Sequence, residues 1–195
     1  MIRFCDIVFS LFGLLILSPL FLIVALWIVI DDPGPVFYRQ QRVGRNNKDF
    51  GLLKFRSMRM GADQMSLITI GDRDPRVTRA GYYIRKYKLD ELPQLWNVLA
   101  GEMSLVGPRP EVRRYVDLYT PEQRIVLSVR PGITDYASIE YIDENRLLAQ
   151  SKDPDKTYVE EIMPAKIALN MHYINHHTFG EYIKLIILTL YKIIR

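Results

Sequence analysis

The sequence has 195 residues and a mass of 22.8 kDa, which suits one modest domain rather than two. Hydrophobic residues make up 49% and charged residues 25%, so intrinsic disorder is excluded, and the single cysteine, Cys5, excludes a disulfide scaffold. The formal net charge of +4 favours an anionic partner, namely nucleic acid, acidic lipid or a phosphorylated substrate.

The apolar residues are concentrated near the N-terminus, where residues 7–30 contain no charged side chain. A helix over this segment would be roughly 36 Å long, which is enough to cross a bilayer core. The run is longer than the apolar part of a signal peptide, and the DDPGP that follows lacks the small residues of a cleavage site. We therefore expect the segment to stay attached, which argues against a purely soluble protein.

Ser18 and Pro19 interrupt the middle of this segment. Proline lacks a backbone N–H and clashes with the carbonyl four residues back, so the helix should kink or break there, and Ser18 could bond a freed carbonyl. Two geometries remain open at this point, a spanning helix with a kink and a re-entrant hairpin that returns to the same face. The basic residues after the segment place that flank in the cytoplasm: Arg39, Arg42, Arg45 and Lys48.

Residues 33–60 alternate short apolar runs with Gly, Pro and Asn, which predicts strands joined by turns. Lys54 and Arg56 lie in an apolar-flanked part of this stretch, where a charge needs a partner. Turn-forming residues predict a loop over 61–80, and a helix is expected over 81–88.

The C-terminal residues 180–195 form a second apolar segment, with four charged residues confined to a narrow stripe. This pattern is typical of a helix that lies in the membrane interface. It is equally typical of a terminal helix that docks on the protein's own core, so both interpretations stay open.

The most informative stretch reads LDELPQLWNVL at residues 89–99. Its apolar residues fall at i, i+3, i+4 and i+7, which predicts one buried helix face. Pro93 suits only a first turn and Gly101 would end the helix, so the helix should begin near Asp90 or Glu91. Backbone N–H groups and the helix dipole favour anions there. The two carboxylates either cap the helix or belong to a site.

The neighbouring residues favour a site. Arg85 precedes Asp90, with lysines beside it, and SLVGPRP at residues 104–110 follows the helix with Arg109 between two prolines. A rigid backbone suits an arginine that clamps phosphate with its planar fork. Carboxylates with fixed arginines fit phosphoryl chemistry, which requires a nucleophile, a metal ligand and charge neutralisation.

Other kinds of site have weaker support. His172 and His176 form an i, i+4 pair, but no H-E-x-x-H accompanies them, so we expect ordinary surface or core histidines. The sequence contains neither a G-x-x-x-x-G-K-[ST] phosphate loop nor a G-x-G-x-x-G fingerprint. No nucleic-acid-binding motif accompanies the basic residues, so nucleic acid is not an expected partner.

The two motifs at residues 89–99 and 103–110 resemble those of the bacterial sugar transferases, the monotopic phosphoglycosyl transferases that start glycan assembly on a polyprenyl phosphate. The Ser-Pro pair, KFRSM at 54–58 and RPGIT at 130–134 extend the resemblance over nearly the whole chain. It implies a mostly helical α/β membrane-associated fold with interfacial amphipathic helices. Residues 1–32 would be a re-entrant helix-break-helix hairpin. Residues 33–195 would be a cytoplasmic catalytic domain with a C-terminal interfacial helix, which matches the minimal catalytic form of the family.

The resemblance also implies a reaction. Asp90 would be the nucleophile that attacks the sugar-bearing phosphorus of a UDP-sugar, releasing UMP, and undecaprenyl phosphate would then take the phosphosugar from the aspartate. Mg²⁺ is implied as cofactor, held by Asp90 and the diphosphate. Glu91 would orient the metal or assist proton movement. The enzyme would work at the cytoplasmic face of a bacterial inner membrane, in contact with lipid, and downstream glycosyltransferases are possible further partners.

The same resemblance assigns substrate-binding roles to basic residues. Arg85 and Arg109 match family positions that bind phosphate, and three more basic residues are expected to contribute to the same cavity: Lys54, Arg56 and Arg130.

One segment departs from the commonest family pattern. Where many members read Gly-x-Ala-Gln-Val-Asn-Gly after RPGIT, this chain reads DYASIEY at residues 135–141. The departure resembles members that handle amino or diamino sugars, so the expected donor carries an N-acetylated amino or diamino sugar. The alternative is a non-catalytic membrane-tethered scaffold or basic binding module.

Overall fold

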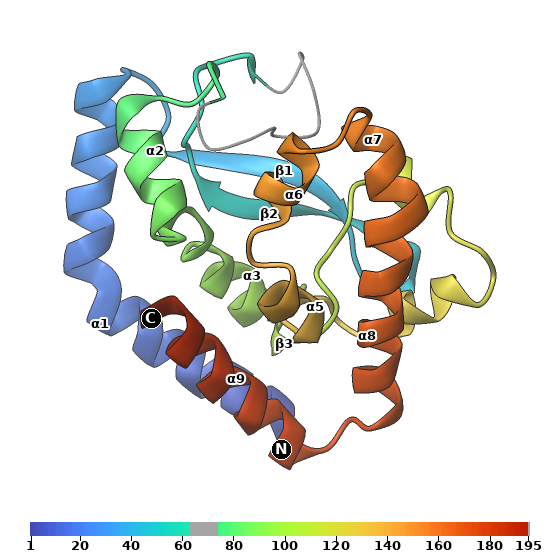
Figure 1. The fold of residues 1–195 in the computed structure, drawn as a ribbon. Coiled ribbons are helices and arrows are strands. Elements are labelled where there is room, and N and C mark those ends of the chain that lie inside the picture. The colour runs from blue at the N-terminus through green and yellow to red at the C-terminus, as the bar shows by residue number, and fades with distance from the viewer. Residues whose placement is uncertain (63–73, 195) are drawn as a thin grey trace.

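The computed structural model describes residues 1–62 and 74–194 (Figure 1). Most of the loop expected over residues 61–80 therefore lies outside the described residues. The fold is a mostly helical α/β arrangement, as the sequence predicted. Its helices are α1 (Ile2–Asp31), α2 (Arg79–Lys86), α3 (Gln94–Ala100), α4 (Arg113–Val116), α5 (Tyr136–Glu140), α6 (Glu144–Ala149), α7 (Pro154–Thr157), α8 (Met163–Asn175) and α9 (Phe179–Ile194).

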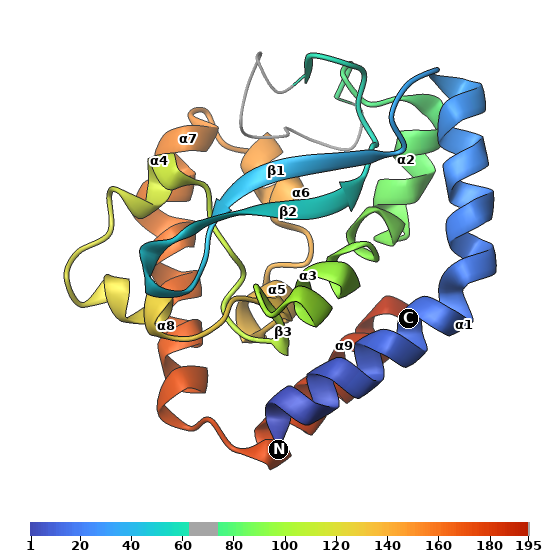
Figure 2. The same cartoon turned by 180° about the vertical axis from the view of Figure 1, so that it is seen from behind.

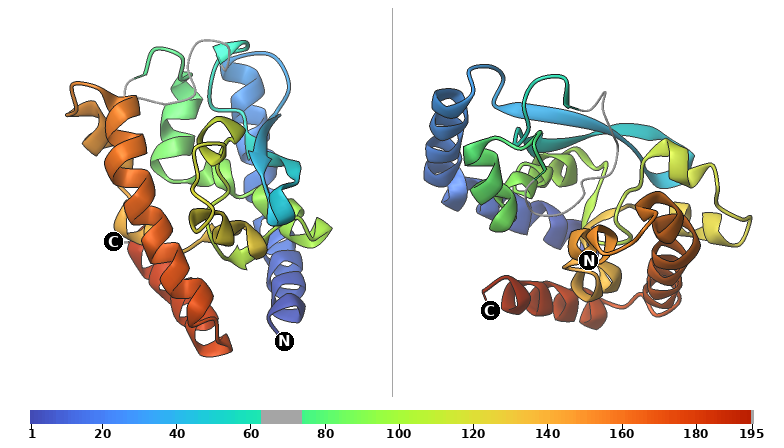
Figure 3. Two further views of the ribbon diagram at one scale, coloured as in Figure 1. Left: turned by 90° about the vertical axis from the view of Figure 1, so that its right-hand side faces the viewer. Right: turned by 45° about the horizontal axis from the view of Figure 1, so that its top comes forward.

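The strands form two separate pairs, and short helical turns join the other elements. The strands are β1 (Phe37–Val43), β2 (Asp49–Phe55), β3 (Ser104–Val106) and β4 (Gly132–Thr134). The 3₁₀ turns span Arg45–Asn47, Leu89–Glu91 and Gln123–Ser128, and a π turn spans Tyr158–Ile162. In Figures 1 and 3, α8 lies across the molecule from α1.

Helix α1 is the one helix in the described chain that is long and apolar enough to cross a membrane. Pro19 lies inside it, and the helix changes direction near its middle (Figures 1 and 2). The Ser18 hydroxyl donates to the Leu15 carbonyl at 2.8 Å. This is the carbonyl that the missing N–H of Pro19 leaves without its helical partner, so the expected compensation by serine is confirmed. The expected break is a bend in one continuous helix, rather than a gap between two helices.

Strands β1 and β2 form an antiparallel hairpin, which confirms the strands predicted within residues 33–60. The connecting turn uses Asn46 and Asn47 with φ of 58° and 60°, a left-handed conformation that asparagine tolerates. The register pairs Tyr38 with Lys54, one residue before the end of β2. The hairpin thereby fixes the position of Lys54 in a regular strand.

The helix expected near Asp90 begins later than predicted. Leu89–Glu91 form a 3₁₀ turn that follows Lys88 in a left-handed conformation (φ 55°), and α3 starts only after Pro93. A helix that ran through Pro93 would clash with the Leu89 carbonyl four residues back, which explains the delay. Gly101 ends α3 with φ of 87°, as predicted. Asp90 and Glu91 therefore lie in a tight turn ahead of the helix.

Strands β3 and β4 pair in parallel and bring two glycines into unusually close contact. A Cβ on Gly132 would lie 2.1 Å from the Gly107 nitrogen, so no residue larger than glycine fits at position 132 without moving the backbone. Gly107 donates its N–H to the Thr134 carbonyl at 3.0 Å, and Gly132 donates to Pro108 at 3.0 Å. The segments 104–110 and 130–134 are thus one backbone-bonded unit.

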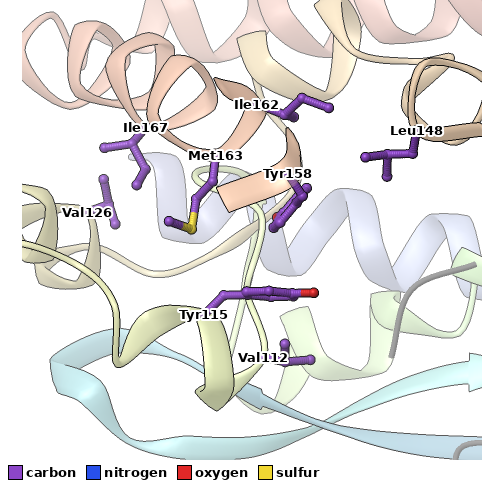
Figure 4. Packing of buried hydrophobic residues seen from close by; sticks show 8 residues of the cluster. All are labelled: Val112, Tyr115, Val126, Leu148, Tyr158, Ile162, Met163 and Ile167. Atoms are coloured by element: carbon purple, nitrogen blue, oxygen red, sulfur yellow. The ribbon is translucent and has the colours of Figure 1, made fainter. Parts of the chain in front are cut away.

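The largest hydrophobic cluster lies between α8, the π turn and the segment around α4 (Figure 4). The rings of Tyr115 and Tyr158 pack at a centroid distance of 4.8 Å in its centre. Its buried members are Val112, Tyr115, Val126, Leu148, Tyr158, Ile162, Met163 and Ile167.

Helix α9 docks on the protein's own core through one face, which confirms one interpretation of the C-terminal segment. On one face Tyr182 and Leu185 are fully buried, and the Tyr182 hydroxyl donates to the buried Asp6 carboxylate of α1 at 2.9 Å. Asp6 also accepts hydrogen bonds from the Ser104 hydroxyl and the Leu105 N–H. On the other face, apolar side chains such as Ile187 remain exposed.

Candidate active site

A single large cavity of about 1110 Å³ connects the β1–β2 hairpin, the Leu89–Glu91 turn and α9. Six of the seven residues that the sequence assigned to substrate or catalysis line this cavity: Lys54, Arg56, Arg85, Asp90, Glu91 and Arg109. These residues come from segments separated by up to 55 positions, so the fold rather than the sequence brings them together.

Asp90 lines this cavity with a carboxylate that has no bonding partner in the described parts of the chain. Its side chain is 8% exposed, and it makes no hydrogen bond or ion pair within the part of the chain that the structure describes. Burial, followed by the negative charge of Glu91, raises the pKa of Asp90 above its usual range. A buried carboxylate oxygen without a partner is available to a substrate phosphorus or a cation.

Glu91 is engaged in a different way. Both of its oxygens face Arg109, whose Nη1 donates to Oε2 at 3.0 Å and whose Nη2 donates to Oε1. Burial alone would raise the pKa of Glu91, but the Arg109 guanidinium overcomes that effect and holds the pKa at about 2. In this geometry Glu91 is an ionised partner that fixes the guanidinium plane of Arg109.

The backbone of Arg109 is fixed as firmly as its side chain. Pro108 and Pro110 restrict the segment, and the Arg109 N–H donates to Oδ2 of Asp135 at 3.0 Å. The other Asp135 oxygen accepts from the Ser138 N–H at 2.5 Å, which caps α5. The sequence showed Asp135 only as a departure from the family pattern, although an Asp three residues before such an N–H is a recognisable N-cap signal.

Three cations around Asp90 lack a negative partner among the described residues: Lys54, Arg85 and Lys88. All three lower the pKa of Asp90 electrostatically, although burial outweighs them. Burial also lowers the pKa of Lys54 to about 8, with Glu91 opposing the shift. Lys54 and Arg85 are half-buried and Lys88 is exposed, and positive charges gathered around one cavity without ion-pair partners attract an anion, so this cluster is suited to bind a phosphate group.

Two of the expected substrate-binding residues have partners within the protein, although Arg56 also lines the cavity. The Arg56 guanidinium is 5% exposed and pairs with Asp32 just after α1, with Nη1 at 2.6 Å from Oδ2. Arg130 lies outside the lining of the cavity, and its Nε donates to the Gly101 carbonyl at 2.9 Å. Arg130 thus stabilises the carbonyl end of α3, where a positive charge is favourable.

The donor set suits a divalent cation that relies on substrate for its remaining ligands. The described residues contain no cluster of three or more His, Cys, Asp or Glu side chains that could hold a metal ion alone. Mg²⁺ is commonly bound by one or two carboxylates together with substrate phosphates and water. Asp90 offers one free carboxylate of that kind, whereas both oxygens of Glu91 are occupied by Arg109.

Taken together, these features define a membrane-associated protein with a long, bent apolar helix and a buried carboxylate surrounded by cations. Comparison with known sequences shows which protein class this is. The profile of the bacterial sugar transferases matches residues 1–195, and the chain belongs to this family. The resemblance stated from the motifs is therefore confirmed.

Relatives in this family carry names that specify different sugars. The UDP-N-acetylgalactosamine-undecaprenyl-phosphate N-acetylgalactosaminephosphotransferase of Aeromonas hydrophila is 45% identical over 140 residues, covering 70% of this chain and 33% of the relative. The galactosyl transferase CpsE of Streptococcus agalactiae is 39% identical over 202 residues, covering 96% and 41%. The UDP-glucose:undecaprenyl-phosphate glucose-1-phosphate transferase of Escherichia coli is 34% identical over 194 residues, covering 96% and 39%. The chain spans about a third to two fifths of the length of these relatives.

Proposed function

We propose that the protein transfers a sugar-1-phosphate from a UDP-sugar to undecaprenyl phosphate and releases UMP. The observation that carries this proposal is Asp90, a buried carboxylate without a partner in the described chain, beside the cations Lys54, Arg85 and Lys88. The names of the Aeromonas hydrophila and Escherichia coli relatives, which specify undecaprenyl phosphate as acceptor, support it.

The reaction has two balanced steps. In the first, an Asp90 oxygen forms a bond to the sugar-bearing phosphorus while the bond from that phosphorus to the bridging oxygen breaks, and UMP leaves with the bridging oxygen. In the second, a phosphate oxygen of undecaprenyl phosphate attacks the same phosphorus and releases the Asp90 carboxylate. Dividing the transfer in this way separates the encounter with a water-soluble anion from the encounter with a lipid anion.

The cationic residues supply charge neutralisation for both steps. Lys54, Arg85 and Lys88 are free to face the diphosphate, and Arg109 is held in a fixed plane by Glu91. Positively charged groups that are already positioned stabilise the charge that develops on the phosphoryl oxygens. Asp90 would also hold Mg²⁺ together with the diphosphate, and this ion would supply Lewis-acid polarisation of the phosphoryl group.

We propose an N-acetylated amino or diamino sugar as the donor sugar. The relative from Aeromonas hydrophila, which its name assigns to N-acetylgalactosamine, is 45% identical over the matched residues, and the Escherichia coli relative named for glucose is 34% identical. The DYASIEY segment lies against the cavity through Ala137, Ser138 and Ile139.

For the membrane, we propose that α1 is re-entrant at the cytoplasmic face of a bacterial inner membrane. The bend at the centre of α1 and the Ser18–Leu15 bond support a helix that turns back before it reaches the far leaflet. Both flanks would then be cytoplasmic, on the side where UDP-sugars are made. The lipid-linked product would pass to downstream glycosyltransferases.

The test is UMP release from a panel of UDP-sugars with Mg²⁺, with and without undecaprenyl phosphate. We expect turnover that requires the lipid and selects one sugar, together with a phosphosugar adduct on Asp90 in the intact mass. Asp90→Asn should remove both the adduct and turnover, while Asp117→Asn, at an exposed carboxylate just after α4, should retain them. An Asp90→Asn protein that still turns over would contradict the covalent mechanism, and a wild type with no release from any donor would favour a non-catalytic scaffold.

A further inference from the structure

The cavity that contains Asp90 has an apolar wall opposite in character to its cationic residues. Six aliphatic side chains line it, of which Leu190 is 56% exposed and the other five are half-buried: Leu92, Leu95, Leu105, Ile133, Ile186 and Leu190. A phosphate group gains nothing from contact with aliphatic side chains, and an apolar surface that is left open to water is unfavourable. The wall therefore needs an apolar occupant.

The wall is continuous across four elements. Strands β3 and β4 are paired so that Leu105 and Ile133 occupy neighbouring positions. Ile186 packs with Leu105 against the buried core of α9, and Thr189 of α9 lies 2.6 Å from Thr134 of β4, hydroxyl to hydroxyl. The C-terminal helix is thereby fixed as one side of the cavity.

The wall also connects the reactive turn to the membrane helix. Leu92 follows Asp90 by two residues, and Leu95 one turn later approaches α1, where a Cβ on Gly13 would lie 3.1 Å from its Cδ1 atom. Asp6 of α1 holds Tyr182 of α9, so α1 and α9 are joined at one end of the wall. An amphiphile that reaches Asp90 from the apolar segment of α1 would pass along these side chains.

We propose that this wall, with α9 as its C-terminal side, holds the first isoprene units of the acceptor lipid. The proposal rests on the proposed function and assigns one part of the same site. Its occupant follows from the two chemistries of the cavity, because an amphiphile with an anionic head and a hydrocarbon chain satisfies the unpaired cations and the aliphatic wall together. The cations hold the phosphate beside Asp90, and the wall directs the chain toward α1.

Helix α9 offers a matched pair of substitutions for a test. Leu190 is 56% exposed and lines the cavity, whereas Ile187 is 60% exposed on the same helix and does not line it. Leu190→Gln and Ile187→Gln remove comparable amounts of exposed aliphatic surface, so any difference between them reports the direction that the side chain faces.

Two half-reactions are measured for each variant. The first is formation of the phosphosugar adduct from the UDP-sugar without lipid, which also serves as a check of folding. The second is the KM for undecaprenyl phosphate, compared with that for a short-chain, water-soluble prenyl phosphate. We expect Leu190→Gln to raise the KM for undecaprenyl phosphate by about tenfold and the KM for the short acceptor by less, with adduct formation unchanged.

The control variant is Ile187→Gln, and separate outcomes would contradict the wall and the proposed function. Ile187→Gln should leave both acceptor KM values within about twofold of the wild-type values. Equal effects of the two substitutions on the acceptor KM would overturn the assignment of the wall while leaving the proposed function intact. A wild type that forms no adduct and transfers nothing to lipid would overturn the proposed function itself.

Discussion

Lys54 is a residue in the cavity whose charge is sensitive to pH just above neutrality. Its ammonium group makes no ion pair or hydrogen bond within the described chain, and burial, which Glu91 opposes, lowers its pKa to about 8. Below that pH the group is charged and attracts the diphosphate, and above it the charge is lost. We therefore expect kcat/KM for the UDP-sugar to fall as the pH rises through about 8.

A substitution separates Lys54 from the other groups in the cavity. Lys54→Arg retains a positive charge well above this range, so its pH profile should stay flat where that of the wild type falls. Steady-state kinetics from pH 6.5 to about 9.5 would measure both profiles. Identical profiles would remove Lys54 from the diphosphate site.

At the residue scale, the sequence was most informative about which side chains matter and least informative about which of them interact. The motif around Asp90 identified the carboxylates, and the prolines around Arg109 identified a rigid arginine. Nothing in the spacing showed that Glu91 and Arg109 pair with each other, because 18 positions separate them and their contact requires the β3–β4 unit. The partners of Arg130 and Arg56 were hidden for the same reason, since the Gly101 carbonyl and the Asp32 carboxylate are distant from them in sequence.

At the scale of elements, α1 shows how one proline shapes a long helix. Pro19→Ala would restore the N–H that bonds the Leu15 carbonyl, and the helix should straighten. A straight helix of this length reaches the opposite side of the bilayer, so we expect the N-terminus to move there.

Cysteine labelling would measure that change. A Phe4→Cys reporter in a Cys5→Ser background places one exposed thiol near the N-terminus, and a membrane-impermeant maleimide applied to intact cells would report its side. Leu22→Ala, an exposed position that leaves Pro19 in place, is the control. An N-terminus that stays on the cytoplasmic side in Pro19→Ala would show that this proline alone does not set the topology.

Elements with strong local signals were predicted well, and their boundaries were predicted less well. The β1–β2 hairpin, α2 and the end of α3 at Gly101 agree with the sequence patterns. The start of α3 was wrong by about one turn, because the carboxylates at 90 and 91 resemble a helix N-terminus while Pro93 delays the helix. This delay places Asp90 in a 3₁₀ turn, where its side chain is buried in the cavity.

At the scale of the whole molecule, the close contact between Gly107 and Gly132 beside the β3–β4 pair fixes the segment that carries Arg109. Gly132→Ala would place a Cβ 2.1 Å from the Gly107 nitrogen, so the strands must separate and the Arg109 segment must move. We expect a loss of about 3 kcal/mol or more in the free energy of unfolding, together with a lower rate of adduct formation.

The matched control is a glycine in an open position. A Cβ on Gly180, in α9, would lie 3.8 Å from its nearest neighbour, the Thr178 hydroxyl. Gly180→Ala should therefore change the unfolding free energy by less than about 1 kcal/mol. Urea unfolding of both variants in detergent would compare their free energies of unfolding. Similar values would show that the contact between Gly107 and Gly132 can accommodate a larger side chain.

The hydrogen bonds that join distant elements could not be predicted from the sequence. Asp135 joins Arg109 to α5, and Asp6 joins α1 to α9 and β3. Local periodicity carries no information about partners so far apart. Asp6 lies one residue before the uncharged segment 7–30, and only the fold shows it as a buried acceptor of three hydrogen bonds.

The bond between Asp6 and Tyr182 joins residues 176 positions apart, and this separation orders events during synthesis. At about 5–20 residues per second, a ribosome needs roughly 9–35 s to make the partner of Asp6 after Asp6 itself. Ile186 and Leu190 are added only after that interval. The apolar segment of α1 is therefore complete well before the last side of the proposed acceptor wall is made.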